Sequence, residues 1–236
     1  MGLLDAYFSH ARQTPHPLLR MTLFRVRTFR VSVVGGFVTR LGVGGLPLLL
    51  PLLYQLGLGM PALQSGLLMM PVAAAAIGMK FISSRLLARL GYRRILTVNT
   101  VMIGVVVCLF APVGSATPIA LIVVLGLGLG FFNSLQYTSM NSMAYADIDT
   151  PDSSMASTIA NSLQQMSIGF GLACGSLIAG RYLGELPQTD RAAMTVALHY
   201  AFLTLGALTI LSSLSFWSLR ARDGESVSRG ALREAA

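Results

Sequence analysis

Arg40 is the residue of this sequence with the clearest capacity for chemistry. It lies inside a long apolar stretch, nine residues beyond Val31. If that stretch crosses a bilayer as a helix, a rise of about 1.5 Å per residue places Arg40 near the midplane. A charge there is costly unless it faces protein or a water-filled cavity. We interpret Arg40 as a cavity-lining cation that attracts anionic substrate groups or a carboxylate elsewhere. The alternative is a structural tie to backbone carbonyls, or snorkelling.

Uncharged polar side chains recur at helical spacing in two later apolar stretches. One set is spaced i, i+3, i+4 and i+8, and the other i, i+4, i+7 and i+8, so each set follows one face of a helix. Such stripes either line a cavity or join helices by hydrogen bonds, and both interpretations stay open. The first set is Asn133, Gln136, Tyr137 and Asn141, and the second is Ser157, Asn161, Gln164 and Gln165.

Acidic residues are absent from all the long apolar stretches. Proton relays within membranes commonly use carboxylates, and these stretches offer none. The stretches also contain no metal cluster and no nucleophile beside a base. Cys108 and Cys174 fall inside apolar runs and are interpreted as buried apolar side chains. We therefore predict no enzyme activity, no cofactor and no metal site.

The composition indicates that lipid is the solvent of this chain. Of its 236 residues 54% are hydrophobic and only 11% are charged, with a mean hydropathy of +0.68. Soluble domains average about a quarter charged residues. The net charge of +8 does not indicate a nucleic-acid partner, because the basic residues stand in short segments between apolar runs. The predicted partner is a lipid bilayer; a small amphipathic substrate is implied only by the family resemblance described below.

Six stretches are long enough to cross a bilayer core of about 30 Å as helices. Glycine, proline and aspartate separate them in short loops, so consecutive helices should run antiparallel. The predicted fold is an all-α membrane protein, a six-helix bundle of residues 31–217. Residues 1–30 are predicted to be a linker with the tail of a preceding helix, and residues 218–236 a basic tail. The predicted spans are 31–56, 61–83, 95–113, 118–143, 154–180 and 194–217.

The arginines predict the orientation of the bundle. Thirteen of them lie in the first 30 residues, in the turn after the second span and in the tail beyond residue 217, whereas only Arg181 and Arg191 lie in the loop on the other side. Short loops rich in Lys and Arg stay in the cytoplasm. Both termini are therefore predicted to be cytoplasmic. The six spans divide into two groups of three that enter from opposite sides, as in an inverted 3+3 repeat.

The basic turn after the second span has a recognisable pattern. It reads SRLLARLGYRR over residues 84–94 and resembles the major facilitator loop signature G-x-x-x-D-R-x-G-R-R. The signature's first glycine is Ser84 here and its acid is Ala88, so the resemblance does not carry over the latch between helices that this acid provides. The residues assigned to the signature are Arg85, Arg89, Gly91, Arg93 and Arg94.

Further segments resemble the 14-span drug:proton antiporter family of the EmrB/QacA type. They are residues 15–29, the run from Arg40 through Pro47, Pro51 and Gln55, and the segments around residues 133–141 and 161–163. The resemblance implies spans 9–14, the C-terminal half of a proton-coupled multidrug exporter that works by alternating access in a bacterial inner membrane. It also implies a missing N-terminal half, in the same chain or a separate one, and adds Gln55 to the cavity candidates.

Glycines inside the fourth and fifth spans fit close packing of helices. A dinucleotide-binding loop would need a preceding strand, which the apolar helical pattern does not offer. The alternative to transport is a stand-alone interaction protein that forms a homodimer through these glycine-rich faces. The glycines are Gly126, Gly128, Gly130, Gly171 and Gly175.

Overall fold

The computed structural model describes residues 21–184, 190–220 and 223, all of them in helices or their connections. The predicted tail of a preceding helix, and most of the predicted basic tail, lie outside the described residues. The helices are η1 (Met21–Arg25), α2 (Arg27–Val43), α3 (Leu46–Leu52), η2 (Leu53–Gly57), α4 (Ala62–Met79), α5 (Ser83–Leu90), α6 (Tyr92–Leu109), α7 (Ile119–Ala144), η3 (Thr150–Asp152), α8 (Ser153–Leu183), α9 (Arg191–Ser212) and η4 (Ser213–Phe216).

Six of the described segments are long and apolar enough to cross a membrane. Their most apolar windows have mean hydropathies of 1.2 to 1.9. This confirms the prediction of an all-α bundle of six membrane-spanning helices. The segments are Arg27–Gly57, Ala62–Met79, Tyr92–Leu109, Ile119–Ala144, Thr150–Leu183 and Arg191–Phe216.

Several helix ends differ from the predicted ranges. The second span was predicted to reach residue 83, but α4 ends at Met79 and the chain turns through Lys80 before α5 begins. Turn-type hydrogen bonds, from the Lys80 N–H to the Ile77 carbonyl and from the Phe81 N–H to the Gly78 carbonyl, close the helix there. The first, third, fifth and sixth spans begin three or four residues earlier than predicted. Hydropathy marks the apolar part of a helix, whereas backbone hydrogen bonds continue into a polar first turn.

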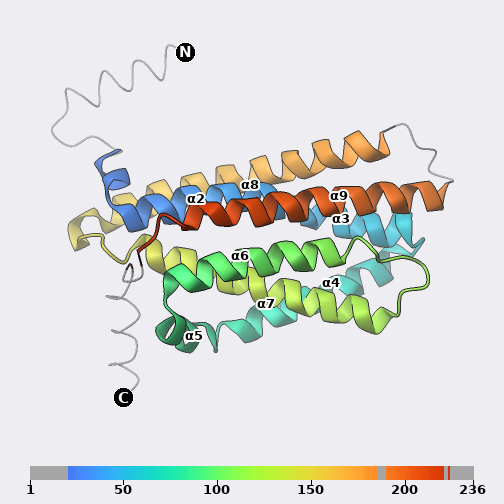
Figure 1. The fold of residues 1–236 in the computed structure, drawn as a ribbon, viewed down its shortest axis with the longest axis horizontal. Coiled ribbons are helices and arrows are strands. Elements are labelled where there is room, and N and C mark those ends of the chain that lie inside the picture. The colour runs from blue at the N-terminus through green and yellow to red at the C-terminus, as the bar shows by residue number, and fades with distance from the viewer. Residues whose placement is uncertain (1–20, 185–189, 221–222, 224–236) are drawn as a thin grey trace, which may run out of the picture.

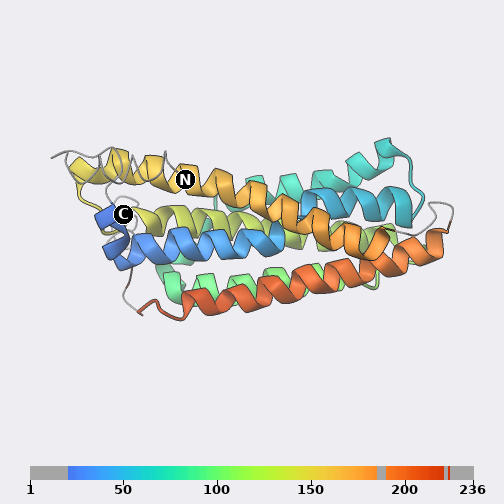
Figure 2. The same cartoon turned by 90° about the horizontal axis from the view of Figure 1, so that it is seen from above.

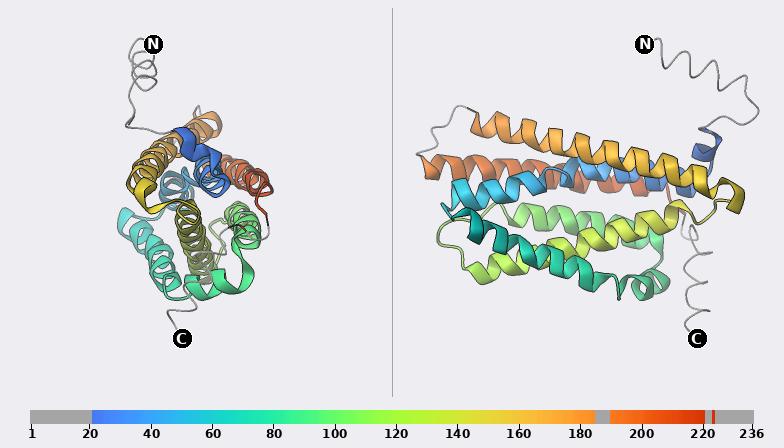
Figure 3. Two further views of the ribbon diagram at one scale, coloured as in Figure 1. Left: turned by 90° about the vertical axis from the view of Figure 1, so that its left-hand side faces the viewer. Right: turned by 180° about the vertical axis from the view of Figure 1, so that it is seen from behind.

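The helices run antiparallel in a bundle whose long axis is horizontal in Figures 1 and 2. The main packing pairs are α4 with α7, α6 with α9, and α2 with α8. Seen end-on, α4 and α8 lie on one side and α6 and α9 on the other, with α2 and α7 between them (Figure 3). The spans containing α4 and α8 are the least buried of the six. The bundle therefore has a well-packed side and a more open side.

The well-packed side is held by aromatic and small residues on α6 and α9. Phe110, just beyond α6, stacks on Phe202, with ring centroids 5.7 Å apart, and both side chains are fully buried. Gly104 and Gly206 let the two backbones approach closely, because a Cβ built on Gly206 would lie 2.3 Å from the Cys108 sulfur. Small residues at such crossings are the usual means of packing helices in lipid.

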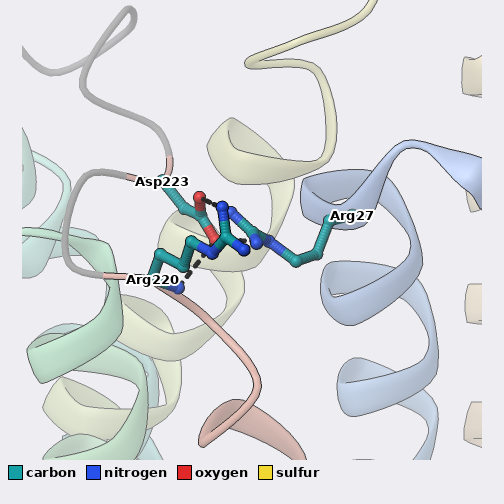
Figure 4. Close-up of polar contacts among 3 residues, drawn as sticks. All are labelled: Arg27, Arg220 and Asp223. Atoms are coloured by element: carbon teal, nitrogen blue, oxygen red, sulfur yellow. Dashed lines mark hydrogen bonds and ion pairs between the residues drawn. The ribbon is translucent and has the colours of Figure 1, made fainter.

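An ion pair joins the beginning and the end of the bundle (Figure 4). The carboxylate of Asp223 accepts a hydrogen bond of 3.0 Å from the Arg27 Nε and a second contact from its Nη2. The backbone N–H of Arg220 donates to the same carboxylate at 2.8 Å. The contact ties the first turn of α2 to the chain that follows η4.

Candidate functional site

Arg40 lies midway along the first span and is 6% exposed. Its guanidinium carbon sits over the ring of Tyr137 on α7, 4.7 Å from the ring centroid, as a cation–π contact requires. The side chain runs back along α2 over Gly36, where a Cβ would approach the Arg40 Nη1 to 2.8 Å. The bare surface at Gly36 thus lets the arginine lie along its own helix and reach α7.

The charge of Arg40 is incompletely partnered. Its buried Nε has no hydrogen-bond acceptor among the residues that the structure describes. None of the nine Asp and Glu residues of the chain lies within helices α2 to α9. Buried charges in proteins are normally paired and hydrogen-bonded. The bundle by itself therefore holds at its centre a buried cation that no acidic side chain of these helices neutralises.

Two hollows meet at Arg40. The larger has a volume of about 270 Å³, and its walls are mainly apolar side chains of α2, α3, α4, α7 and α8. Asn133 and Tyr137 are its polar members besides Arg40. The smaller, of about 20 Å³, has room for about one water molecule and is lined by Ser32, Asn141 and Gln164 among others. Arg40 thus borders both the larger, mainly apolar hollow and the smaller, more polar one.

The first span breaks directly beyond Arg40. The Gly44 N–H donates to the Arg40 carbonyl at 2.8 Å, and α3 starts after Gly45. The two glycines face Gly171 and Gly175 of α8: a Cβ on Gly171 would lie 2.2 Å from the Arg40 oxygen, and one on Gly175 would lie 2.4 Å from the Gly45 Cα. The glycines of α8 therefore seat that helix on the break, inside the bundle.

The glycines of α7 also face neighbours within the chain. A Cβ on Gly130 would lie 2.0 Å from the Val72 oxygen of α4, and one on Gly126 would lie 3.5 Å from the Val72 side chain. A Cβ on Gly128 would lie 3.9 Å from Val106 of α6. Together with Gly171 and Gly175, these glycines are engaged by internal packing, which gives the homodimer alternative no support from them.

The polar stripe of α7 divides between two neighbours. Gln136 is buried, accepts a hydrogen bond of 2.8 Å from the Asn99 amide and donates one of 2.7 Å to the Thr100 hydroxyl. It therefore joins α7 to α6 and points away from the hollows. Asn133 and Tyr137 line the larger hollow, as described, and Asn141 lines the smaller one. The sequence analysis did not identify Asn99 and Thr100 of α6 as partners of Gln136. Asn99 could have been noticed, because it is a polar residue inside an apolar stretch.

The remaining cavity candidates lie mostly on outer surfaces. Of the α8 stripe, Gln164 lines the smaller hollow, whereas Asn161 and Gln165 are exposed on the bundle. Asn161 makes a long hydrogen bond of 3.5 Å to Ser157 on its own helix. Gln55 is also exposed and donates to the Ser65 hydroxyl at 3.4 Å, near the start of α4. Gln55, Asn161 and Gln165 are therefore not brought to Arg40 within this bundle.

The basic turn forms the short helix α5 and the first turn of α6. Gly91 has φ +75° and ψ 155°, a backbone conformation that is essentially restricted to glycine. Its N–H closes α5 by donating to the Leu87 carbonyl at 3.0 Å. All four arginines of the turn, Arg85, Arg89, Arg93 and Arg94, are exposed. The glycine thus has a conformational role and the arginines lie at the surface of the bundle's end.

Comparison with known proteins gives one family and a set of bacterial relatives. Residues 5–172 match the model of the Major Facilitator Superfamily. A putative multidrug resistance protein MdtD of Pectobacterium carotovorum is 35% identical over 217 residues, which are 90% of this chain and 46% of that protein. A probable transport protein HsrA of Haemophilus influenzae is 31% identical over 223 residues, 94% of this chain and 48% of that protein. The chain spans about half the length of these curated relatives.

Proposed function

The chain belongs to the major facilitator superfamily, and from this premise we propose that it is the C-terminal six-helix half of a multidrug exporter. The whole transporter would work by alternating access, with two bundles rocking about a site near the bilayer midplane. The observation that carries the proposal is the larger hollow beside Arg40. It lies on the open side of the bundle, between the two least buried spans, and holds a cation with no acidic residue in the surrounding helices.

The missing partner of this half would be a second six-helix bundle that covers the face between α4 and α8. Both helices carry exposed apolar side chains, including Leu67 and Met70 on α4 and Ile168 and Leu172 on α8, and Ile168 also lines the larger hollow. In transporters built from repeats, the substrate site forms where the halves meet. The hollow at Arg40 would then be one wall of a closed central cavity, and the exposed polar residues of α8 would face it or the second bundle.

The drug-export part of the proposal rests on the relatives, which include proteins named as putative multidrug resistance proteins. A mainly apolar hollow with a few polar groups suits amphipathic molecules. Coupling to protons needs a titrating group, and none of the α-helices α2 to α9 contains an Asp or Glu; Asp152 lies in the short helix η3, at the end of the bundle where α8 begins. The proposal therefore places the proton-binding acid in the other half.

The orientation follows from the ends of the bundle. Helices η1, α5 and η4 meet at one end, and the turn that enters α8 lies at the same end (Figure 1). The arginines of the basic turn, together with Arg25, Arg27, Arg30 and Arg220, lie in these segments or within a few residues of them along the chain, while Arg181 and Arg191 flank the loop between α8 and α9 at the opposite end. By the positive-inside rule the arginine-rich end faces the cytoplasm of a bacterial inner membrane.

Export by a reconstituted pair of halves tests this proposal. The chain is expressed in an efflux-deficient bacterial strain, alone and with the N-terminal half of a similar full-length relative, and accumulation of ethidium is measured. We expect reduced accumulation with both halves and no effect of either half alone. Export by this chain alone, at the rate of the pair, would refute the half-transporter function.

A further inference from the structure

The uncompensated charge of Arg40 points to a ligand that this bundle does not contain. The side chain is 94% buried, its Nε lacks an acceptor in the described structure, and the helices around it carry no carboxylate. We propose that Arg40 and Tyr137 form a binding site for the carboxylate of an amphipathic organic acid. This inference rests on the proposed transporter function and adds one substrate class, organic acids, beside the cationic ethidium of the test above, which would bind away from Arg40.

The chemistry of the arginine selects a carboxylate. A guanidinium offers a planar fork of N–H donors that matches the two oxygens of a carboxylate, and the resulting charge-assisted hydrogen bonds are among the strongest in proteins. The ring of Tyr137 supports the cation from α7, and Gly36 leaves room for the guanidinium along α2. These two features therefore hold the donor group in place before any ligand arrives.

The surrounding hollow indicates what the carboxylate is attached to. Apolar side chains of five helices, including Val43, Leu50, Leu129 and Ile168, form most of its wall. Asn133 supplies one amide, and the volume of about 270 Å³ lies just below the range of roughly 300–1,000 Å³ that is typical of ligand pockets. A small acid with an apolar body would place its body against these walls and its charge on Arg40. A cationic drug would instead bring a second positive charge to the arginine.

The same carboxylate chemistry has two sources in an intact transporter. One is the substrate, which the apolar walls favour. The other is an Asp or Glu side chain of the second six-helix bundle, which would reach Arg40 across the open face between α4 and α8. The two sources make different predictions for the chain alone and for the chain paired with an N-terminal half.

Calorimetric titration of the purified full chain in detergent tests the site. The probes are 4-phenylbutyrate and its neutral amide, which share an apolar body and differ in charge. We expect wild type to bind the acid at least about tenfold more tightly than the amide, and Arg40→Gln to lose this preference. Arg40→Lys keeps the charge and should keep part of the preference. Arg93→Gln, which removes an exposed arginine of the same chain, is the matched control and should bind as wild type does.

Circular dichroism and gel filtration establish that each variant is folded before titration. Equal affinities of wild type for acid and amide, or an acid preference that survives in Arg40→Gln, would overturn the site. If Arg40→Gln fails to fold, the comparison rests on Arg40→Lys and on Tyr137→Leu, which should weaken acid binding several-fold. An unchanged acid affinity in Tyr137→Leu would then count against the site.

The paired halves distinguish the two sources. Acid binding that persists in the pair, with export of a fluorescent carboxylate lost in Arg40→Gln, supports the substrate. Acid binding that disappears on pairing, with Arg40→Gln weakening copurification of the halves, would overturn the substrate and assign the carboxylate to the second bundle. A third outcome separates the site from the transporter function. If the wild-type chain shows no preference for the acid, and the pair carrying Arg40→Gln still exports ethidium at the wild-type rate, the carboxylate site is refuted and the transporter function stands.

Discussion

Gly171 is the position where one added methyl group should do the most damage. Replacement by alanine would place a Cβ 2.2 Å from the Arg40 carbonyl oxygen and 2.9 Å from the Gly44 Cα. Both atoms belong to the backbone, so neither can swing aside as the end of a side chain would. We predict that Gly171→Ala forces α8 away from the break between α2 and α3.

The expected magnitude follows from a control on the same helix. Overpacking a well-packed site costs about 1–3 kcal/mol, while alanine gains up to about 1 kcal/mol over glycine in helix propensity. Gly169, two residues earlier, has no atom within 4 Å of a built Cβ, so Gly169→Ala receives the propensity gain without the clash. The difference in free energy of unfolding between the two variants is therefore about 1–3 kcal/mol, equal to the clash alone.

Thermal unfolding of the purified chain in detergent measures this difference. At about 2–4 °C per kcal/mol for a chain of this size, Gly171→Ala should melt about 2–12 °C below Gly169→Ala. Gly169→Ala itself should melt at or slightly above wild type. Equal melting temperatures for the two variants would refute the close seating of α8 on the helix break.

Three further substitutions test other contacts by thermal unfolding. Gln136→Leu should lose about 0.6–2 kcal/mol by breaking the hydrogen bonds between α7 and α6, whereas exposed Gln165→Leu should be neutral; equal effects would contradict the network. Gly91→Ala should lose about 1–3 kcal/mol because its φ of +75° strains any side chain, whereas Gly78→Ala in open space should not; a neutral Gly91→Ala would argue against that turn. Asp223→Asn should lose under about 1 kcal/mol, and less still in high salt, because the ion pair at the start of α2 is partly solvated; a larger, salt-independent loss would mean that it is desolvated.

Sequence patterns predicted the architecture well because its cause is local. Each membrane-spanning helix must satisfy its own backbone hydrogen bonds in lipid, so a run of about twenty apolar residues is sufficient to indicate it. The six-helix all-α fold is confirmed, and the family model confirms the resemblance to the major facilitator superfamily and the prediction of a transporter rather than an enzyme. The loop signature was informative because Gly91 has a conformation that few other residues tolerate.

The sequence did not predict toward which neighbouring helix each polar side chain points. The α7 stripe follows one helical face by spacing, yet Gln136 binds α6 while Asn133 and Tyr137 line the larger hollow, because that face spans the boundary between two neighbours. The break at Gly44 was also not predicted, since the surrounding run is continuously apolar. The partner of a polar side chain and the position of a helix break depend on which helices pack alongside. The spacing of polar residues within one helix does not reveal those neighbouring helices.

The position of Arg40 depends on three helices at once. Its carbonyl is the acceptor for Gly44 and lies against Gly171 of α8, so its backbone is fixed at the crossing of α8 with the break in the first span. Its guanidinium rests on the ring of Tyr137 of α7. Local bending at the break would have to separate α8 from Arg40 or Arg40 from α7. If the proposed transporter works by alternating access, we therefore expect α2, α7 and α8 to move together as one body, with the hollow at Arg40 open to one side of the membrane at a time.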